Sequence, residues 1–299
     1  MVMVKIRILV LLTFISVSFS CSGPSKTDVL RSRLNNIISG KKAVVGVGFM
    51  DLSTGDTLTI NGSTHFPMQS VFKLHLAVAV LDQLEKRGLN LDHRILVGKW
   101  ELHPDTHSPL RDEFPKGDSL FAIRTIIQYT VSKSDNNACD MLFRFVGGPA
   151  PVDRYIHELG IKEVGISADE EAMHKDWDVQ YTNWTTPYSA LDLLKRIQAQ
   201  SHLSTINNDC LLTAMTETST GEKKIKGELP EGTIVAHKTG ASGKSEKGIT
   251  AASNDVGIVT LPDGRQFAIA VFVSDSSETE EENEKIISSI AKAAWDYYQ

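Results

Sequence analysis

Strand-like segments lie near both ends of this chain, and the long stretch between them has the patterns of helices. Near the start, residues 42–62 predict two strands around the turn "STGD". Near the end, residues 233–243 and 254–276 predict further strands, the last two joined at the turn "PDGR". This order favours one sheet assembled from both ends of the chain, with a helical insertion between them.

Helical patterns flank and separate these strands. Amphipathic helices are expected over 26–40 and 282–298, and helical patterns dominate from Pro67 to about Ala214, with the clearest at 68–81, 119–132, 136–148, 150–160 and 187–200. We therefore expect an α/β domain from residues 25–66 and 217–299 and an all-helical domain from 67–216. A cleft between two such domains is where small-molecule sites tend to form.

The first twenty residues have the pattern of a secretory signal peptide. Lys5 and Arg7 precede an apolar run from Ile8 to Phe19, which is shorter than the roughly 20 residues that span a bilayer. We expect an exported, periplasmic protein, either cleaved after Ser20 or lipidated at Cys21. The formal net charge of -6, with no long basic run, makes nucleic acid an improbable partner.

The remaining cysteines and the histidines predict no metal site. In an exported chain, Cys139 and Cys210 could form one disulfide or remain two buried thiols, and the sequence leaves both readings open. In "HPDTH", Pro104 disrupts the helix that would place His103 and His107 on one face.

A serine and a lysine open a segment that otherwise has the composition of a buried helix. In "MQSVFKLHLAVAVL" (68–81), Ser70 and Lys73 stand three residues apart, so a helix places both on one face. Burial disfavours the charged form of an amine, so Lys73 could accept the serine proton and act as its base. The spacing alone is weak evidence, because Ser289 and Lys292 repeat it in the C-terminal amphipathic helix.

Two tripeptides distinguish the first match from the second. "SDN" (134–136) lies between helical segments and "KTG" (238–240) lies in a strand, and both in this order are hard to assign to chance. With them the chain resembles the penicillin-recognising serine enzymes. The resemblance implies a nucleophile with its lysine, a serine that relays a proton to the leaving nitrogen, and residues that line the cleft: Ser70, Lys73, Ser134, Asn136, Lys238, Thr239 and Gly240.

The polar segment 168–187 resembles the omega loop of the class A β-lactamases, whose glutamate holds the deacylating water. Matching "EEAMH" (170–174) to the pattern Glu-x-x-x-Asn places this glutamate at Glu170. The resemblance leaves open whether Lys73, or Glu170 through a water, takes the proton of Ser70. His174 stands where asparagine is usual, as in a branch of extended-spectrum and cephalosporin-hydrolysing enzymes that also has the strand "AHKTG". His174 either ties the loop together or contacts the water.

Two further roles follow from the resemblance. The amides of Ser70 and Ala241 are expected to form an oxyanion hole. In related enzymes an arginine meets the substrate carboxylate, and in this chain Lys224, in "GEKKIKG", takes its place. The planar guanidinium is thereby replaced by an ammonium, which acts as a point charge. A solvated surface lysine is the alternative reading.

The resemblance implies a five-stranded antiparallel sheet flanked by helices, of the α/β (α+β) class, with an inserted helical domain. It also implies a monomer that needs no metal or organic cofactor and whose partners are β-lactam antibiotics. The predicted function is β-lactam hydrolysis, with cephalosporins preferred. The alternatives are a penicillin-binding D-Ala-D-Ala peptidase, a non-catalytic β-lactam receptor, and a secreted binding module with accidental motifs; the Glu170 loop favours the hydrolase.

Overall fold

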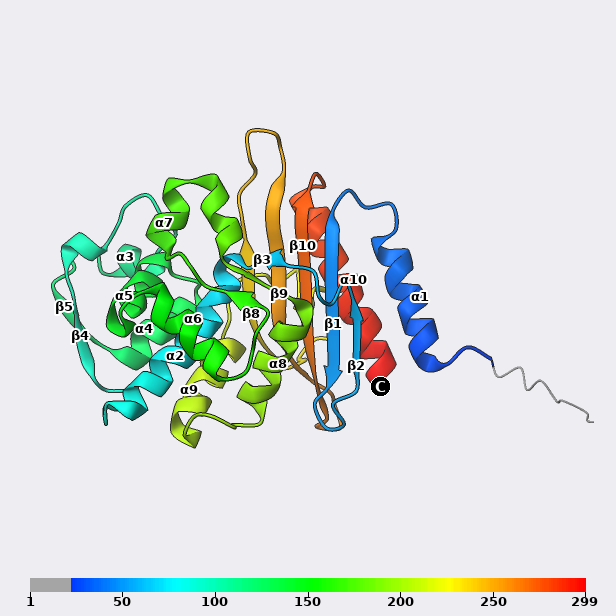
Figure 1. Ribbon diagram of the computed structural model, residues 1–299, viewed down its shortest axis with the longest axis horizontal. Helices are drawn as coiled ribbons and strands as arrows, with labels where there is room; N and C mark the ends of the chain where they lie inside the picture. The colour runs from blue at the N-terminus through cyan, green and yellow to red at the C-terminus, as the bar shows by residue number, and fades with distance from the viewer. Residues whose placement is uncertain (1–22) are drawn as a thin grey trace, which may run out of the picture.

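A five-stranded antiparallel sheet lies at the centre of the computed structural model, which describes residues 23–299 (Figure 1). The predicted signal peptide and Cys21 lie outside the described residues. The order of strands is β2-β1-β10-β9-β8, which confirms the predicted fold class. The strands are β1 (Val44–Asp51), β2 (Thr57–Ile60), β8 (Val235–Ala241), β9 (Thr250–Thr260) and β10 (Gln266–Ser276).

Helices make up most of the remaining chain, with two small sheets, β3-β7-β6 and β4-β5. The helices are α1 (Lys26–Ile38), α2 (Phe72–Lys86), α3 (Pro109–Glu113), α4 (Ile123–Ser132), α5 (Asn136–Val146), α6 (Pro149–Glu158), α7 (Glu170–Lys175), α8 (Pro187–Gln198), α9 (Thr205–Thr216) and α10 (Glu280–Tyr298). The 3₁₀ turns are Gln69–Val71, Lys99–Glu101, Trp177–Thr182 and Ile225–Glu228. The short strands are β3 (Phe66–Pro67), β4 (Arg94–Val97), β5 (Ser119–Ala122), β6 (Val164–Gly165) and β7 (Trp184–Thr185).

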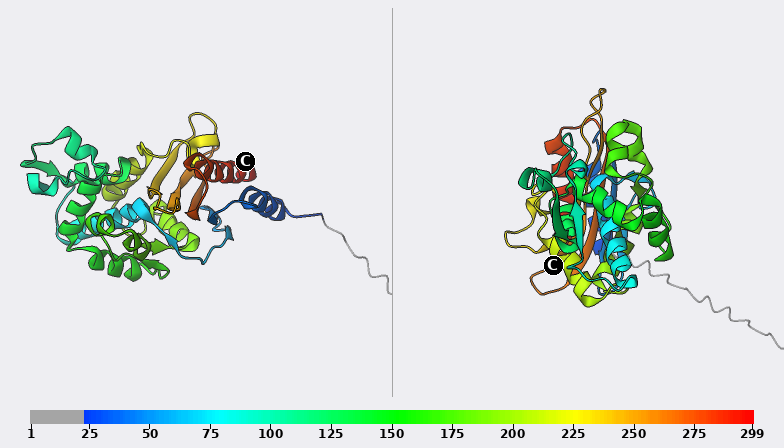
Figure 2. Two further views of the ribbon diagram at one scale, coloured as in Figure 1. Left: turned by 90° about the horizontal axis from the view of Figure 1, so that it is seen from above. Right: turned by 90° about the vertical axis from the view of Figure 1, so that its left-hand side faces the viewer.

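Both faces of the sheet are buried. Because side chains alternate along a strand, Ile269 and Val271 of β10 pack into the core shared with α1 and α10. Ala270 and Phe272, on the opposite face, join the larger core built with the helices between α2 and α9. The helices that begin and end the described chain lie side by side (Figures 1 and 2), so the sheet sits between two apolar layers.

One expected helix begins later than its pattern suggested. Residues 119–132 were expected to be helical throughout, but Ser119–Ala122 form β5 and pair with β4. Leu120 and Phe121 are apolar neighbours that fit either a helix or a strand, and the pairing with residues 94–97 decides for the strand. The helix then starts at Ile123.

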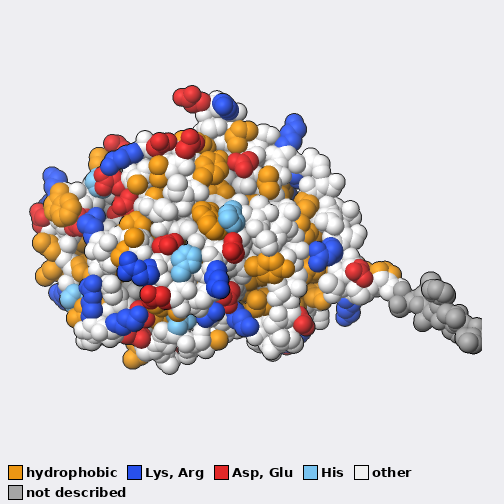
Figure 3. All heavy atoms as spheres, in the orientation of Figure 1, with side chains coloured by type: hydrophobic (Ala, Val, Ile, Leu, Met, Phe, Trp, Pro, Cys, Tyr) orange, Lys and Arg blue, Asp and Glu red, His pale blue; other side chains and the backbone are white. Residues whose placement is uncertain are grey.

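The surface carries charges of both signs. Acidic and basic side chains are interspersed on the face shown in Figure 3, with no broad area of one sign. Among residues 23–299, none of the helices has the length and apolar character that crossing a membrane requires.

Candidate active site

Ser70 lies in the 3₁₀ turn that precedes α2 and is partly exposed. The neighbouring strand β9 fixes this turn, because the side-chain amide of Asn254 donates to the carbonyl oxygens of Pro67 (2.8 Å) and Met68 (3.1 Å). Gln69 has a positive φ of 46°, and its side-chain Nε2 donates to Gln180 Oε1 at 2.5 Å. The turn therefore holds Ser70 at the surface of a cavity at the start of α2.

Lys73 follows on the first turn of α2 and is fully buried. Its Nζ donates to the carbonyl oxygen of Ser134 (2.7 Å) and to Asn136 Oδ1 (2.5 Å), and lies 2.9 Å from Glu170 Oε1. Within the described residues its partners are these three oxygens, and Ser70 Oγ is not among them. Two segments far from α2 in the sequence, residues 134–136 and the start of α7, thus meet at this amine.

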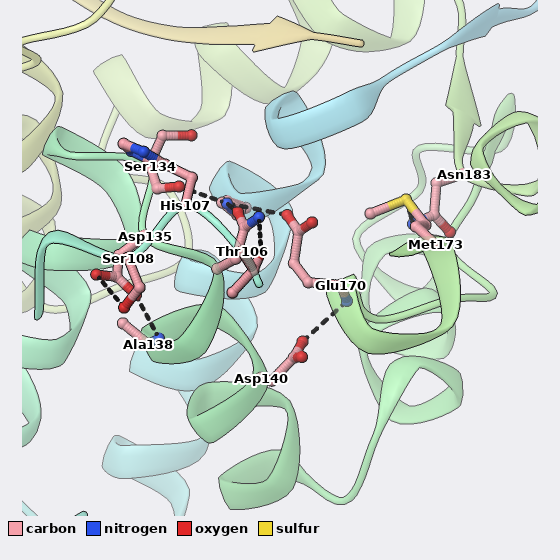
Figure 4. Close-up of polar contacts among 12 residues, drawn as sticks. Thr106, His107, Ser108, Ser134, Asp135, Ala138, Asp140, Glu170, Met173 and Asn183 are labelled. Carbon is pink, nitrogen blue, oxygen red and sulfur yellow. Dashed lines mark hydrogen bonds and ion pairs between the residues drawn. The ribbon is translucent and has the colours of Figure 1, made fainter. Parts of the chain in front are cut away.

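Ser134 has the left-handed backbone conformation, with φ of 56°, in the short turn between α4 and α5. Its neighbour Asp135 caps α5 by accepting from the Ala138 amide at 2.8 Å, and also accepts from the Leu110 amide at 2.6 Å and from the Ser108 hydroxyl (Figure 4). These bonds hold the turn so that the Ser134 hydroxyl faces Lys238.

Lys238 lies on strand β8, and its Nζ donates to Ser134 Oγ at 3.0 Å. Burial and the nearby ammonium of Lys73 lower the pKa of Lys238 well below its ordinary value. An amine with a lowered pKa and a direct bond to a hydroxyl can assist proton movement through that hydroxyl.

Strand β8 forms the edge of the sheet beside the Ser70 turn. A Cβ added at Gly240 would lie 2.4 Å from the Met68 carbonyl oxygen, so only glycine allows the strand to approach this closely. Ala241 ends the strand, and Ser70 and Ala241 line the same cavity of about 500 Å³. Thr239, on the same strand, shares a 2.6 Å hydrogen bond with the Thr220 hydroxyl.

Glu170 is the first residue of α7, and its side chain is only 11% exposed. The carboxylate of Asp140 accepts from the amides of Glu170 (2.9 Å) and Glu171 (3.0 Å). Figure 4 shows Glu170 projecting from α7 toward Thr106, with the turn that contains Ser134 beyond it. Asp140 thereby sets the start of α7 and the direction of the glutamate.

Asn183 holds the other end of the loop. It is fully buried, accepts from the amides of Ser167 (2.8 Å) and Ala168 (3.0 Å), and donates to the Ala168 carbonyl oxygen (2.8 Å). His174, in contrast, is exposed and lines a neighbouring cavity of about 210 Å³. Asn183 and Asp140 are therefore among the residues whose hydrogen bonds tie this loop, and sequence patterns did not identify either of them.

Asp140 should make stability depend on pH. Burial raises its pKa to about 7, compared with about 3.9 in an unfolded chain. The native state therefore holds the extra proton between these values, and stability is lost as the pH rises toward 7. Relative to an Asp140→Asn variant, we expect the wild type to lose about 2 kcal/mol in unfolding free energy between pH 5 and pH 8, measured by urea unfolding. Parallel pH profiles for the two proteins would contradict this.

Lys224 is 5% exposed and lines the same cavity as Ser70. Its Nζ donates to the carbonyl oxygens of Gly240 (3.1 Å) and Asn254 (3.2 Å), so it is not a solvated surface lysine. Beneath it, the fully buried His237 and Asp255 pair at 2.9 Å. The polar pair Asn254-Asp255 in an otherwise apolar strand was a sequence signal for this buried network.

The two cysteines, and the two histidines of the "HPDTH" segment, take no part in the contacts around Lys73. Cys139 and Cys210 are free thiols, and burial raises the pKa of both. His107 lines the main cavity, with Nε2 3.0 Å from the Lys133 carbonyl oxygen, and His103 lines the neighbouring one. Across residues 23–299, no three His, Cys, Asp or Glu side chains are placed to hold a metal ion.

Comparisons with known proteins agree over nearly the whole chain. A family model described as "Beta-lactamase enzyme family" matches residues 29–298. Beta-lactamase VEB-1 of Pseudomonas aeruginosa is 44% identical over 100% of this chain and 99% of its own length. Extended-spectrum beta-lactamase PER-1 of the same organism is 43% identical over 95% of this chain and 92% of its own length.

Solved structures give the same picture. The TLA-1 extended-spectrum beta-lactamase is 52% identical, with a TM-score of 0.90 over 92% of this chain and 99% of that one. An ancestral class A beta-lactamase is 23% identical, with a TM-score of 0.80 over 89% of this chain and 99% of that one. At this identity the similarity is evidence for the fold alone.

Proposed function

The chain belongs to the β-lactamase enzyme family, as a class A serine β-lactamase of the extended-spectrum branch, and from this we propose that Ser70 is its nucleophile. The observation that carries the proposal is the convergence on Lys73, whose amine contacts Glu170, Asn136 and the Ser134 backbone one helical turn from Ser70. Ser70 and Glu170 line one cavity, and the buried Lys73 contacts Glu170.

In acylation, Ser70 Oγ attacks the strained β-lactam carbonyl carbon. The Lys73 amine donates to the Ser134 carbonyl oxygen and to Asn136 Oδ1 and lies 2.9 Å from Glu170 Oε1, and we propose that Glu170 takes the serine proton through a water molecule. The negative charge on the carbonyl oxygen is stabilised by the amides of Ser70 and Ala241. The C–N bond breaks, and Ser134 passes its proton to the nitrogen and recovers one through Lys238 or Lys73. The proton that Glu170 accepted passes back to this lysine pair, so Glu170 is again a carboxylate before deacylation.

In deacylation, Glu170 removes a proton from a water molecule that attacks the ester carbon. The bond between Ser70 Oγ and the acyl carbon then breaks, the proton passes from Glu170 to Ser70 Oγ, and the opened acid leaves. Lys224, Thr239 and Asn136 would bind the substrate, the first two at its carboxylate and the third at its amide side chain. We assign His174 to the outer wall of the loop, with no bond to the water.

We make further proposals about the domains, the cellular location and the preferred substrates. We propose that residues 67–216 form the helical domain, that the site lies between it and the α/β domain, and that the enzyme is an exported, periplasmic monomer without cofactor. Whether Cys21 carries a lipid is a separate question that labelling with a fatty acid in cells answers. The branch to which the relatives belong supports a preference for cephalosporins, including those with bulky oxyimino side chains.

The test is turnover of a chromogenic cephalosporin by the purified mature protein. We expect many product molecules per protein and a steady rate after the first turnover, because in this proposal Glu170 activates the water that releases the acyl group. A single burst equal to the protein concentration, followed by no further product, would instead show a receptor or a peptidase that stays acylated. Boiled protein provides the background rate.

A further inference from the structure

The cavity that holds Ser70 continues past strand β8 to the first turns of α10. We call this part the outer end of the cavity and define it by Lys224, Glu280, Asn283 and Glu284, all of which line it. None of the three α10 residues has a role in the reaction described above. The outer end therefore offers contacts to a part of the substrate away from the bond that breaks.

Two carboxylates at the outer end are available to a ligand. Glu280 and Glu284 are four residues apart on α10, so they lie on one face of the helix. Among residues 23–299, neither has a hydrogen-bond or ion-pair partner, whereas Glu282 in the same turn pairs with Lys41. Both act on Lys224: burial lowers the pKa of this lysine, and the carboxylates of Asp255, Glu284 and Glu280 oppose the lowering.

A buried donor at the same place lacks a partner. Asn283 is 1% exposed, and its Oδ1 accepts from the Ser276 hydroxyl at 2.7 Å. Its Nδ2 has no hydrogen-bond partner among the described residues. Buried donors are nearly always paired in proteins, so an acceptor atom on a bound molecule would complete this group.

We propose that the outer end of the cavity selects zwitterionic cephalosporins, by binding a cationic substituent next to the ring carboxylate. The inference rests on the proposed function. In a cephalosporin, the carboxylate and the variable methylene substituent are attached to adjacent ring atoms. A carboxylate that meets Thr239 and Lys224 therefore directs the substituent toward the wall beyond Lys224.

The lining of this cavity carries charges of both signs, as such a molecule does. Lys224 would meet the carboxylate, Glu280 and Glu284 would meet the cation, and Asn283 Nδ2 can donate to the carboxylate. Lys224 and Lys244 also line this cavity, but among the described residues neither forms an ion pair with Glu280 or Glu284. A neutral substituent would leave both glutamates without a directly paired cation and close to the substrate's own negative group. Binding should therefore favour the cationic substituent.

A simpler explanation is that acidic residues merely stabilise the start of α10, where they complement the helix dipole. Glu281 serves that purpose equally well, since it is exposed and does not line the cavity. It differs from Glu280 by one position, and the same substitution removes the same charge from the same helical turn. Glu281→Gln is therefore the matched control.

The experiment compares two cephalosporins that share a thienylacetamido side chain and differ only in the methylene substituent, pyridinium in one and acetate ester in the other. In Glu280→Gln/Glu284→Gln, we expect the ratio of kcat/KM for the cationic over the neutral substrate to fall about fivefold, mainly through KM. In Glu281→Gln the ratio should be unchanged. In the wild type, raising the salt concentration should lower the ratio.

An unchanged ratio in the double variant, or an equal fall in Glu281→Gln, would overturn the inference. Hydrolysis of the neutral substrate by the double variant shows that it is folded, so the ratio remains interpretable. Failure of the wild type to turn over either substrate would overturn the proposed function itself. Normal turnover of both with a ratio insensitive to the glutamates would overturn only the inference about the outer end.

Discussion

Turnover of a chromogenic cephalosporin should fall by about five orders of magnitude in a Ser70→Ala variant. Ser70 is partly exposed, and its hydroxyl makes no hydrogen bond that the fold requires among the described residues, so alanine fits the 3₁₀ turn. The nucleophile is lost while the Lys73 contacts remain. Steady-state hydrolysis, thermal unfolding and intact-protein mass spectrometry together should show a folded protein with neither turnover nor a covalent adduct.

The chain provides a matched control in its second Ser-x-x-Lys pair. Both residues of this pair lie on α10. Ser289 Oγ donates to Glu228 Oε1 at 3.0 Å, and Lys292 pairs with Asp296. Ser289→Ala removes the same atom from the same sequence pattern, far from the cavity that contains Ser70. We expect full activity from it, and residual turnover above one part in about a thousand in Ser70→Ala would contradict the assignment of the nucleophile.

The second large effect is expected from Glu170→Gln. An amide of the same shape cannot remove a proton from water, so the acyl-enzyme should accumulate and kcat should fall by about a thousandfold. Mass spectrometry of the protein mixed with a cephalosporin should show a persistent adduct equal to the mass of the acyl group. A variant that turns over normally would show that Glu170 is not the base for deacylation.

Glu171→Gln is the control for that experiment. Glu171 is exposed and pairs with Lys175 at 2.7 Å, so its loss should leave the rate unchanged. The rate at which the adduct forms in Glu170→Gln also identifies the base for acylation. Slow formation assigns that role to Glu170, as we propose from the contacts of Lys73, and formation at the wild-type rate assigns it to Lys73.

Local patterns in the sequence predicted most of the architecture and pointed to the groups that we propose to react. The strands near both ends and the helices between them follow from side-chain periodicity, and the motifs around Ser70, Ser134 and Lys238 are short enough to recognise directly. Ser119–Ala122 was assigned wrongly because two apolar neighbours fit both periodicities. Pairing with a distant strand decides the outcome, and such pairing is invisible within a short window.

The residues that position Glu170 could not be found in the same way. Asp140 and Asn183 bind backbone amides that lie far from them in the sequence, and such contacts have no fixed spacing. A partial signal exists for Asp140, since it lies four residues after Asn136 and so on the same face of α5. Asn254, which holds the Ser70 turn from strand β9, likewise has only its polarity within an apolar strand as a clue.

The short helix α7 has no buried residue, although it begins with Glu170. The orientation of the glutamate depends on backbone amides held by Asp140 and on the anchoring of the neighbouring loop by Asn183. The outward side chains of α7 contribute little to either. Evolution can therefore alter the outer surface of this helix, including His174, at small cost to folding or to the catalytic carboxylate. This makes α7 a region where resistance enzymes of this kind can diversify while the chemistry is preserved.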